Sequence, residues 1–175
     1  QFPLLGSSFE YQIVENQQLY GGIAQAYRPV ILKDLIPSTT YDRSDQNLKD
    51  ASGYNAEIGY RGTWKNFRWD LSVFQMMYNN RMGKISQTDV QGKFYLLQTN
   101  IGGSVTRGIE SSIQAEFELT SKMNLSVFSA TSFMRAKYDS AIIRNGNTNI
   151  SIHGNFVESV PDWISRNGLT LSYMT

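Results

Sequence analysis

The side chains that most often carry chemistry in proteins are scarce in this sequence. His153 is the one histidine, cysteine is absent, and the formal net charge at pH 7 is +1. A catalytic triad, a zinc site or a haem ligand set would have to be built around His153 alone. We find no nucleophile–base pair, phosphate-binding loop or metal-ligand spacing, so the sequence predicts neither an enzyme nor a cofactor. The balanced charge also gives no reason to expect a nucleic-acid partner.

Charged residues instead recur at every second position of strand-like segments. In residues 107–119, Glu110, Glu116 and Glu118 share one parity, while Ile109 and the other residues of its parity are mostly apolar. Successive side chains of a strand point to opposite faces. Unpaired carboxylates in a dry core would cost several kcal/mol each, so their face must meet water, a lumen or basic residues. The polar parities elsewhere hold Arg61, Arg68 and Asp70, which we interpret as cross-strand ion pairs on a wetted wall.

The same alternation runs through most of the chain and predicts an all-β fold of about seven antiparallel strands. The clearest hairpin lies between Tyr54 and Val73, where two alternating segments flank a polar break at Lys65 and Asn66. Each segment has one apolar and one polar face. The expected strands are residues 9–13, 19–27, 54–60, 67–73, 107–119, 123–137 and 163–174.

The connections between these segments alternate in length. The short ones are residues 15–18, 63–66 and 120–122, and the long ones are residues 30–51, 81–103 and 138–162. Within the second long connection, residues 93–98 have the character of one arm of a small hairpin. An up-and-down transmembrane β-barrel places its long loops at one rim and its short turns at the other. The pattern is therefore typical of an antiparallel β-barrel segment, and no apolar run reaches the length of a membrane helix.

Five stretches, in this order, resemble the β-barrel of TonB-dependent outer-membrane receptors, most closely the ferric-citrate type. One is the glycine-bearing strand that ends in Tyr27, Arg28 and Pro29, and another is the Arg-Gly-Ile-Glu strand that begins at Arg107. The five stretches are YGGIAQAYRPVILKDL, NLKDASGYNAEIGYRGTW, DLSVFQMMYNNRMG, NIGGSVTRGIESSIQAEF and VESVPDWISRNGLTLSY.

The resemblance implies a receptor of the Gram-negative outer membrane that binds an extracellular iron chelate, ferric citrate or another siderophore, and imports it with TonB coupling. Because the family barrel has about twenty-two strands, residues 1–175 are expected to be a partial barrel domain from its C-terminal part. The plug domain and the terminal strand of the family have no counterpart here. The implied partners are the chelate, outer-membrane lipid and, through the N-terminal part, the TonB complex.

The resemblance also implies roles for two sets of residues. Cations on the long loops can gather an anionic chelate, because guanidinium groups bind carboxylates through paired, charge-assisted hydrogen bonds. Tryptophans favour the headgroup level of a membrane. The ligand-binding candidates are Arg28, Tyr41, Arg43, Arg81, Lys84 and Arg144. The membrane-interface candidates are Trp64, Trp69 and Trp163.

Two other interpretations fit the residues alone. A soluble all-β binding module, such as a carbohydrate-binding sandwich, would have the same alternation, with the apolar face as an internal core. A passive porin-like barrel needs neither a plug nor energy coupling. The tryptophans would then be core residues in the sandwich, and the loop cations would be ordinary solvated charges in either fold.

Overall fold

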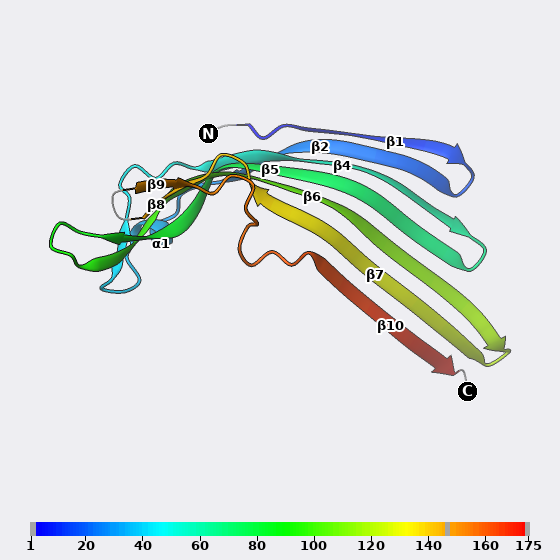
Figure 1. Ribbon diagram of the computed structural model, residues 1–175. Helices are drawn as coiled ribbons and strands as arrows, with labels where there is room; N and C mark the ends of the chain where they lie inside the picture. The colour runs from blue at the N-terminus through cyan, green and yellow to red at the C-terminus, as the bar shows by residue number, and fades with distance from the viewer. Residues whose placement is uncertain (1–2, 146–147, 174–175) are drawn as a thin grey trace.

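The computed structural model describes residues 3–145 and 148–173, except for the side chains of Arg144, Asn145 and Asn149. Its main sheet is antiparallel along the path β1-β2-β4-β5-β6-β7-β10, so each strand pairs with the next one along the path. The sheet is open and curved, with β1 and β10 as its edges (Figure 1). Seven strands on this path agree with the predicted number.

The strands are longer than the alternation alone indicates. Long strands suit this sheet because each crosses from the short-turn end to the loop end in one run. The strands of the main sheet along this path are β1 (Gly6–Val14), β2 (Gln17–Arg28), β4 (Ala51–Trp64), β5 (Phe67–Thr88), β6 (Phe94–Thr120), β7 (Met123–Tyr138) and β10 (Trp163–Tyr173). The remaining elements are α1 (Leu32–Leu35), β3 (Asp42–Ser44), β8 (Ile142–Asn145) and β9 (Thr148–Ser151).

The sheet has one apolar and one polar face, as the parity predicts. The register places Ile58, Val73, Ile109, Phe133 and Trp163 directly opposite one another across five strands. All five belong to the many large apolar side chains that are exposed; Val73, for example, is 48% exposed and Ile109 56%. We name this side the membrane face and the opposite side the lumen face. In the described part of the chain, no second sheet covers the membrane face, because the other sheet is the β8–β9 hairpin.

Tight turns join the strands at one end of the sheet. Asn16 and Lys65 have φ values of 63° and 54°, which are typical of tight hairpin turns. The β6–β7 turn follows a bulge between Glu118 and Thr120. The short connections therefore lie together at one end, on the right in Figure 1, and α1, β8 and β9 gather at the other.

The prediction of a long irregular connection over residues 81–103 is wrong. β5 and β6 pair as far as Thr88 and Phe94, so only residues 89–93 form the turn. The alternation fails there because bulges interrupt the register between Tyr78 and Met82, where Asn80 has a φ of 54°. Each bulge shifts the parity of the strand. The expected hairpin arm at residues 93–98 is confirmed as the beginning of β6.

The buried residues cluster at the loop end, not between the strands of the sheet. Ile101, Ala136 and Tyr138 pack with Ala141 and Val157, and three half-buried residues, Ile85, Ile152 and Val160, complete the cluster. Residues 138–162 are thus more than the polar excursion that the sequence predicts. They contain the β8–β9 hairpin and supply part of the core. Residues 30–51 carry only α1 and the short β3, which pairs in parallel with β6.

Candidate ligand-binding loops and the two faces of the sheet

Polar side chains on the lumen face bind one another across neighbouring strands. The Tyr20 hydroxyl donates to Asp70 Oδ1 at 2.6 Å, and Arg61 pairs with Glu10 at 2.6 Å. The Arg61 guanidinium also lies 4.9 Å from the centre of the Tyr20 ring. The expected ion-pair role of Arg61 is confirmed, whereas Asp70 accepts from a tyrosine hydroxyl instead. These contacts tie four strands, β1, β2, β4 and β5, into one polar wall.

The three tryptophans all lie on the membrane face. Trp64 and Trp69 lie near the β4–β5 turn, where Trp69 packs with the Tyr60 ring at a centroid distance of 5.7 Å. Trp163 begins β10 and lies opposite Phe133. From Trp163 to Tyr173, the 11-residue β10 rises about 33 Å along the strand, or about 25 Å along the barrel axis at a typical tilt. Trp163 therefore lies toward the loop end of the sheet, whereas Trp64 and Trp69 lie near its short-turn end; the headgroup location of all three remains a prediction.

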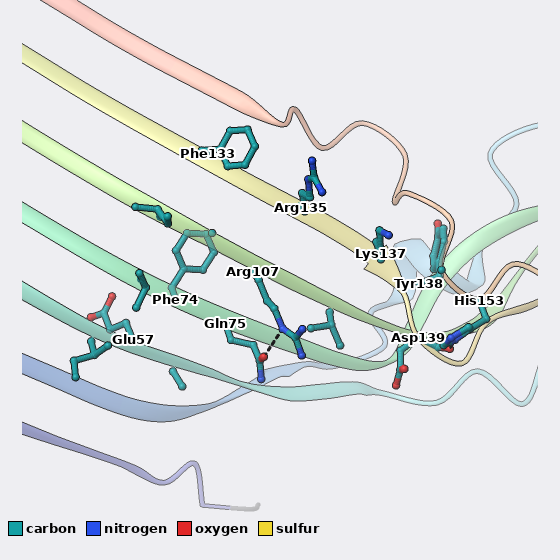
Figure 2. A pocket seen from close by; sticks show the side chains of 17 residues that line it. Glu57, Phe74, Gln75, Arg107, Phe133, Arg135, Lys137, Tyr138, Asp139 and His153 are labelled. Carbon is teal, nitrogen blue, oxygen red and sulfur yellow. Dashed lines mark hydrogen bonds between the residues drawn. The ribbon is translucent and has the colours of Figure 1, made fainter.

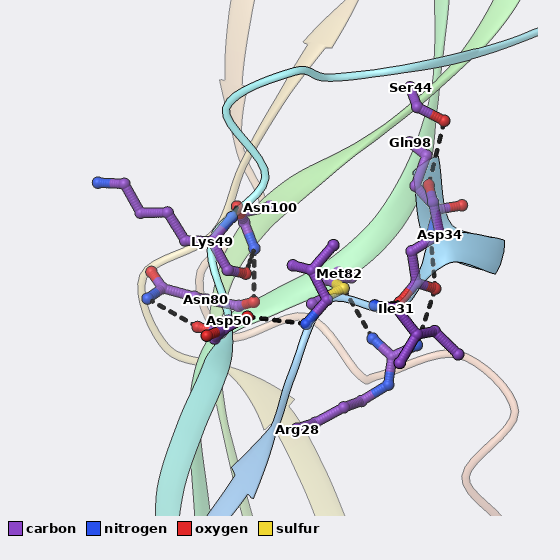
Figure 3. A network of polar contacts seen from close by, with 11 residues as sticks. Arg28, Ile31, Asp34, Ser44, Lys49, Asp50, Asn80, Met82, Gln98 and Asn100 are labelled. Atoms are coloured by element: carbon purple, nitrogen blue, oxygen red, sulfur yellow. Dashed lines mark hydrogen bonds and ion pairs between the residues drawn. The ribbon is translucent and has the colours of Figure 1, made fainter. Parts of the chain in front are cut away.

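Arg28 is held at the base of the first long loop by a buried carboxylate. Its guanidinium donates to both carboxylate oxygens of Asp34, at 2.9 and 3.1 Å, and Asp34 is only 8% exposed. Asp34 also accepts from the Ile31 backbone amide at 3.2 Å, within the single turn α1. The other guanidinium nitrogen of Arg28 lies 2.7 Å from Met82 Sδ on β5 (Figure 3). The arrangement fixes the loop of residues 29–51 against β5.

A second set of bonds holds the return of this loop to the sheet. The Asn100 side chain on β6 accepts a hydrogen bond from the Lys49 amide at 2.7 Å and donates one to the Lys49 carbonyl at 2.9 Å. It also donates to the Asn80 carbonyl at 2.8 Å. Asp50 accepts from the Val30 amide at 2.7 Å and from the Tyr27 hydroxyl. Both ends of the loop are thereby tied to strands that are far from it in sequence (Figure 3).

Two ion pairs join the first long loop to the β5–β6 hairpin. Lys84 binds Asp42 at 3.2 Å, and Arg43 binds Asp89 at 3.1 Å. The Arg43 guanidinium also lies 4.1 Å from the centre of the Tyr95 ring. An anionic ligand would have to compete with these carboxylates for each cation.

Four aspartates at the loop end have lowered pKa values. Lys84 holds the pKa of Asp42 below its ordinary value, and the Asn47 amide does the same for Asp45. The Tyr27 hydroxyl lowers the pKa of Asp50, and the Lys93 amide lowers that of Asp89. Each group is therefore a charged acceptor at neutral pH, and the loop contacts are charge-assisted.

The remaining ligand-binding candidates are placed differently. Tyr41 is 56% exposed, and its backbone carbonyl accepts from the Leu96 amide. Arg81 is half-buried beside the β5 bulge, and the Arg144 side chain lies outside the described residues. The structure thus brings Arg28, Arg43 and Lys84 together at the loop end in ion pairs; their ligand-binding role stays a prediction.

Sequence reasoning did not identify the residues that hold the loops, above all Asp34, Asp50 and Asn100. Their partners lie 20 to 64 residues away in most of these contacts, so no local pattern marks them. The chain stretch Asn-Leu-Lys-Asp before β4 is one of the family-like segments, and it contains Asp50. That resemblance was the one available signal.

No described helix is both long and apolar enough to cross a membrane. No group of three or more histidine or carboxylate side chains is placed to hold a metal ion, again among the residues that the structure describes.

Comparison with solved structures shows the same fold in a copper transporter and in receptors for siderophores and ferric enterobactin. The copper transporter OprC superposes with a TM-score of 0.66 at 14% identity, over 94% of this chain and 23% of OprC. The siderophore receptor PirA from Pseudomonas aeruginosa gives 0.55 at 18% identity, over 78% of this chain and 30% of PirA. A mutant of the ferric enterobactin receptor PfeA from the same organism, in complex with enterobactin, gives a TM-score of 0.56 at 15% identity, over 97% of this chain and 32% of PfeA.

The chain spans about a quarter to a third of the length of these structures. No curated protein sequence matches it significantly. The family model described as "TonB dependent receptor-like, beta-barrel" matches residues 4–175, which is nearly the whole chain. The chain therefore belongs to the TonB-dependent receptor family and forms part of its β-barrel.

Proposed function

We propose that the protein to which this chain belongs is an active-transport receptor of the Gram-negative outer membrane. The observation that carries the proposal is the sheet itself, with one continuous apolar face that nothing in the described chain covers. In water such a face would be an aggregation hazard, whereas lipid removes the cost of exposing it. The family match supports TonB coupling over a passive porin.

The proposed cargo is an extracellular iron chelate, such as ferric citrate or another siderophore. Among the similar structures, PirA is a siderophore receptor, PfeA a ferric enterobactin receptor and OprC a copper transporter. These similarities support a metal-containing cargo and do not favour citrate in particular. Transport of this kind requires binding and release at the loops and passage through the lumen, without covalent chemistry.

The proposed entry point is the loop end, where Arg28, Arg43 and Lys84 lie on neighbouring segments. A multivalent anionic chelate can replace the internal carboxylates because guanidinium groups bind carboxylates in pairs. Arg43 is 51% exposed as a side chain and Arg28 45%. Both are therefore accessible from the solvent while they are paired.

Uptake of radiolabelled iron chelates by cells that carry the full-length receptor tests the proposal. We expect accumulation to require both the receptor and TonB, and to be strongest for one chelate of a panel that includes ferric citrate. Uptake that persists without TonB would support a porin, and no uptake of any metal chelate would contradict the proposal. Arg28→Ala with Arg43→Ala should lower affinity about tenfold or more, with the exposed Lys33→Ala as the control. Unchanged affinity in the double variant would exclude these two residues as ligand contacts.

A further inference from the structure

Three cations lie on the membrane face, on the loop side of the row that holds Ile109 and Phe133. Arg107 on β6 is directly opposite Arg135 on β7, and Lys137 follows two residues later on β7. Two residues nearer the short turns, the opposed pair is Ile109 and Phe133. Arg107 and Arg135 therefore replace apolar side chains at one level on adjacent strands, and two apolar residues, Val105 and Met77, lie in line with Lys137.

These cations are exposed and free of internal carboxylates. In the part of the chain that the structure describes, ion pairs form at Arg28, Arg43, Arg61 and Lys84, and none forms at the three cations of the membrane face. Arg107 Nε donates to Gln75 Oε1 on β5 at 2.7 Å, which orients the guanidinium along the sheet. Lys137 Nζ lies 5.3 Å from the centre of the Phe156 ring. Each cation thus retains donors for an external acceptor.

A hollow of about 1090 Å³ brings these groups together (Figure 2). Its floor includes Val73 and Ile109, and Figure 2 shows Arg135 and Lys137 on one side of it with Arg107 and Gln75 across from them. At the loop end it is closed by Asp139 and by His153, whose Nδ1 contacts the Asp139 carbonyl. Two carboxylates border the hollow: Asp139 at this end, and Glu57, which belongs to the opposite parity of β4. Three cations therefore outweigh the one carboxylate at the loop end.

The level of the cations matches that of a lipid headgroup. From the β6–β7 turn at Met123 to Arg135 the strand advances 12 residues, about 40 Å along β7 and about 30 Å along the barrel axis at a typical tilt. The apolar band of an outer-membrane barrel is about 25 Å tall. Measured from the β6–β7 turn, Arg135 and its neighbours therefore stand just beyond an apolar band of this height, on the loop side.

We propose that Arg107, Arg135 and Lys137 bind the phosphate groups of a lipid in the membrane leaflet on the loop side. The acyl chains of this lipid would lie on the row of Ile109, Phe133 and Trp163, and its phosphates would meet the cations directly above. A phosphorylated lipid combines these two features at this spacing, which favours it over a soluble anion. The inference rests on the membrane location given under the proposed function.

Lipid phosphorus that remains bound to the purified full-length receptor is the measurement that tests this site. The double variant Arg107→Gln with Arg135→Gln should retain less phosphorylated lipid, on the order of tenfold less in a competition with neutral lipid. The matched control is Arg68→Gln with Arg166→Gln, which removes two exposed guanidinium groups from the lumen face. We expect this control to retain as much lipid as the unmodified receptor.

The results of these measurements distinguish a lipid site from a site for a soluble anion, and failure of the lipid site from failure of the proposed function. Equal lipid retention in the membrane-face variant and the control would overturn the site, as would displacement of the lipid by millimolar inorganic phosphate, because the site would then bind a soluble anion. If the double variant fails to fold, Lys137→Gln alone must still reduce retention severalfold. Outer-membrane partition and TonB-dependent uptake of the unmodified receptor are measured in parallel. Their failure would overturn the proposed function, whereas normal uptake with unchanged lipid retention would overturn the lipid site alone.

Discussion

At the scale of residues, the loops are held by aspartates that pair with cations of other elements. Asp34 binds Arg28, Asp42 binds Lys84, and Asp89 binds Arg43. Such charge-assisted contacts are stronger than neutral hydrogen bonds. They order the loop end without a large core, since the buried cluster there is small. The same contacts occupy the cations that the sequence singles out for ligand binding, so ligand capture and loop order are linked at these residues.

Acid should loosen this loop assembly. The pKa values of Asp42, Asp45, Asp50 and Asp89 lie below their ordinary value of 3.8 in the folded chain. A carboxyl group with a lowered pKa in the folded state stabilises that state fully above its unfolded-state pKa, and this contribution is lost as pH falls through the folded-state pKa. We therefore expect loop order to be constant from neutral pH to about pH 5 and to decline below about pH 4.

Hydrogen exchange of the full-length receptor in detergent, corrected for the intrinsic rate at each pH, measures this effect. Protection in residues 29–51 should fall below about pH 4, while amides of β4 between Tyr54 and Tyr60 stay protected and serve as the control. Loss of loop protection between pH 7 and pH 5 would contradict the assignment to these aspartates.

Residue parity explains which contacts were predictable. Arg61 and Asp70 lie on the polar parity of well-alternating strands, and the structure shows both in cross-strand contacts there. Asp34 lies in a single helical turn within a stretch that has no period, and Gln98, one of its partners, is 64 residues away. Contacts of that kind depend on how the loops fold back over the sheet, which no local pattern encodes.

At the scale of elements, close packing between strands depends on glycine at particular positions. A Cβ added at Gly108 on β6 would lie 2.6 Å from the Phe74 ring and 2.7 Å from the Phe133 carbonyl oxygen. The Phe74 ring therefore lies over the position that a side chain would occupy. β6 is flanked by β5 and β7 at this point, so neither neighbour can move away without breaking its own ladder.

Replacing Gly108 with valine should destabilise the barrel. Overpacking of this kind typically costs about 1–3 kcal/mol, because both the ring and a backbone carbonyl must shift. The midpoint of heat-modifiable gel mobility of the full-length receptor gives the stability. Gly22→Ala is the control, since the three atoms nearest to its added Cβ belong to Ser7 and Ser8, the closest at 3.2 Å, and none is part of a ring. A midpoint for Gly108→Val equal to that of the control would contradict this packing account.

The elements also show where alternation stops being informative. Strand periodicity marked residues 67–73 and 107–119, yet β5 and β6 extend to Thr88 and back to Phe94. The bulges near Asn80 reset the parity, and beyond them the hairpin has loop segments on its sides in place of lipid. Without a uniform apolar face, the sequence of a strand loses its period of two.

At the scale of the whole molecule, the order of short and long connections predicted the open sheet well. That order depends only on which rim each connection occupies, so errors of several residues at strand ends do not disturb it. The apolar face then extends across every strand of the path, from Phe9 on β1 to Leu171 on β10. The central claim of the account is that this face meets lipid and the opposite face meets water.

Two adjacent positions on β10 test that claim most directly. Leu169 lies on the membrane face opposite Val127, and Thr170 lies on the lumen face opposite Ser126. Both are exposed in the chain, so neither side chain packs in a core. In an outer-membrane barrel, arginine facing lipid near the bilayer midplane costs about 2–4 kcal/mol, whereas lumen substitutions cost little.

The decisive measurement is the free energy of unfolding of the full-length receptor in lipid vesicles, with Leu169→Arg compared with Thr170→Arg. We predict a loss of about 2–4 kcal/mol for Leu169→Arg and of less than about 1 kcal/mol for Thr170→Arg. Equal effects of the two substitutions, or a larger loss for Thr170→Arg, would contradict the assignment of the membrane face.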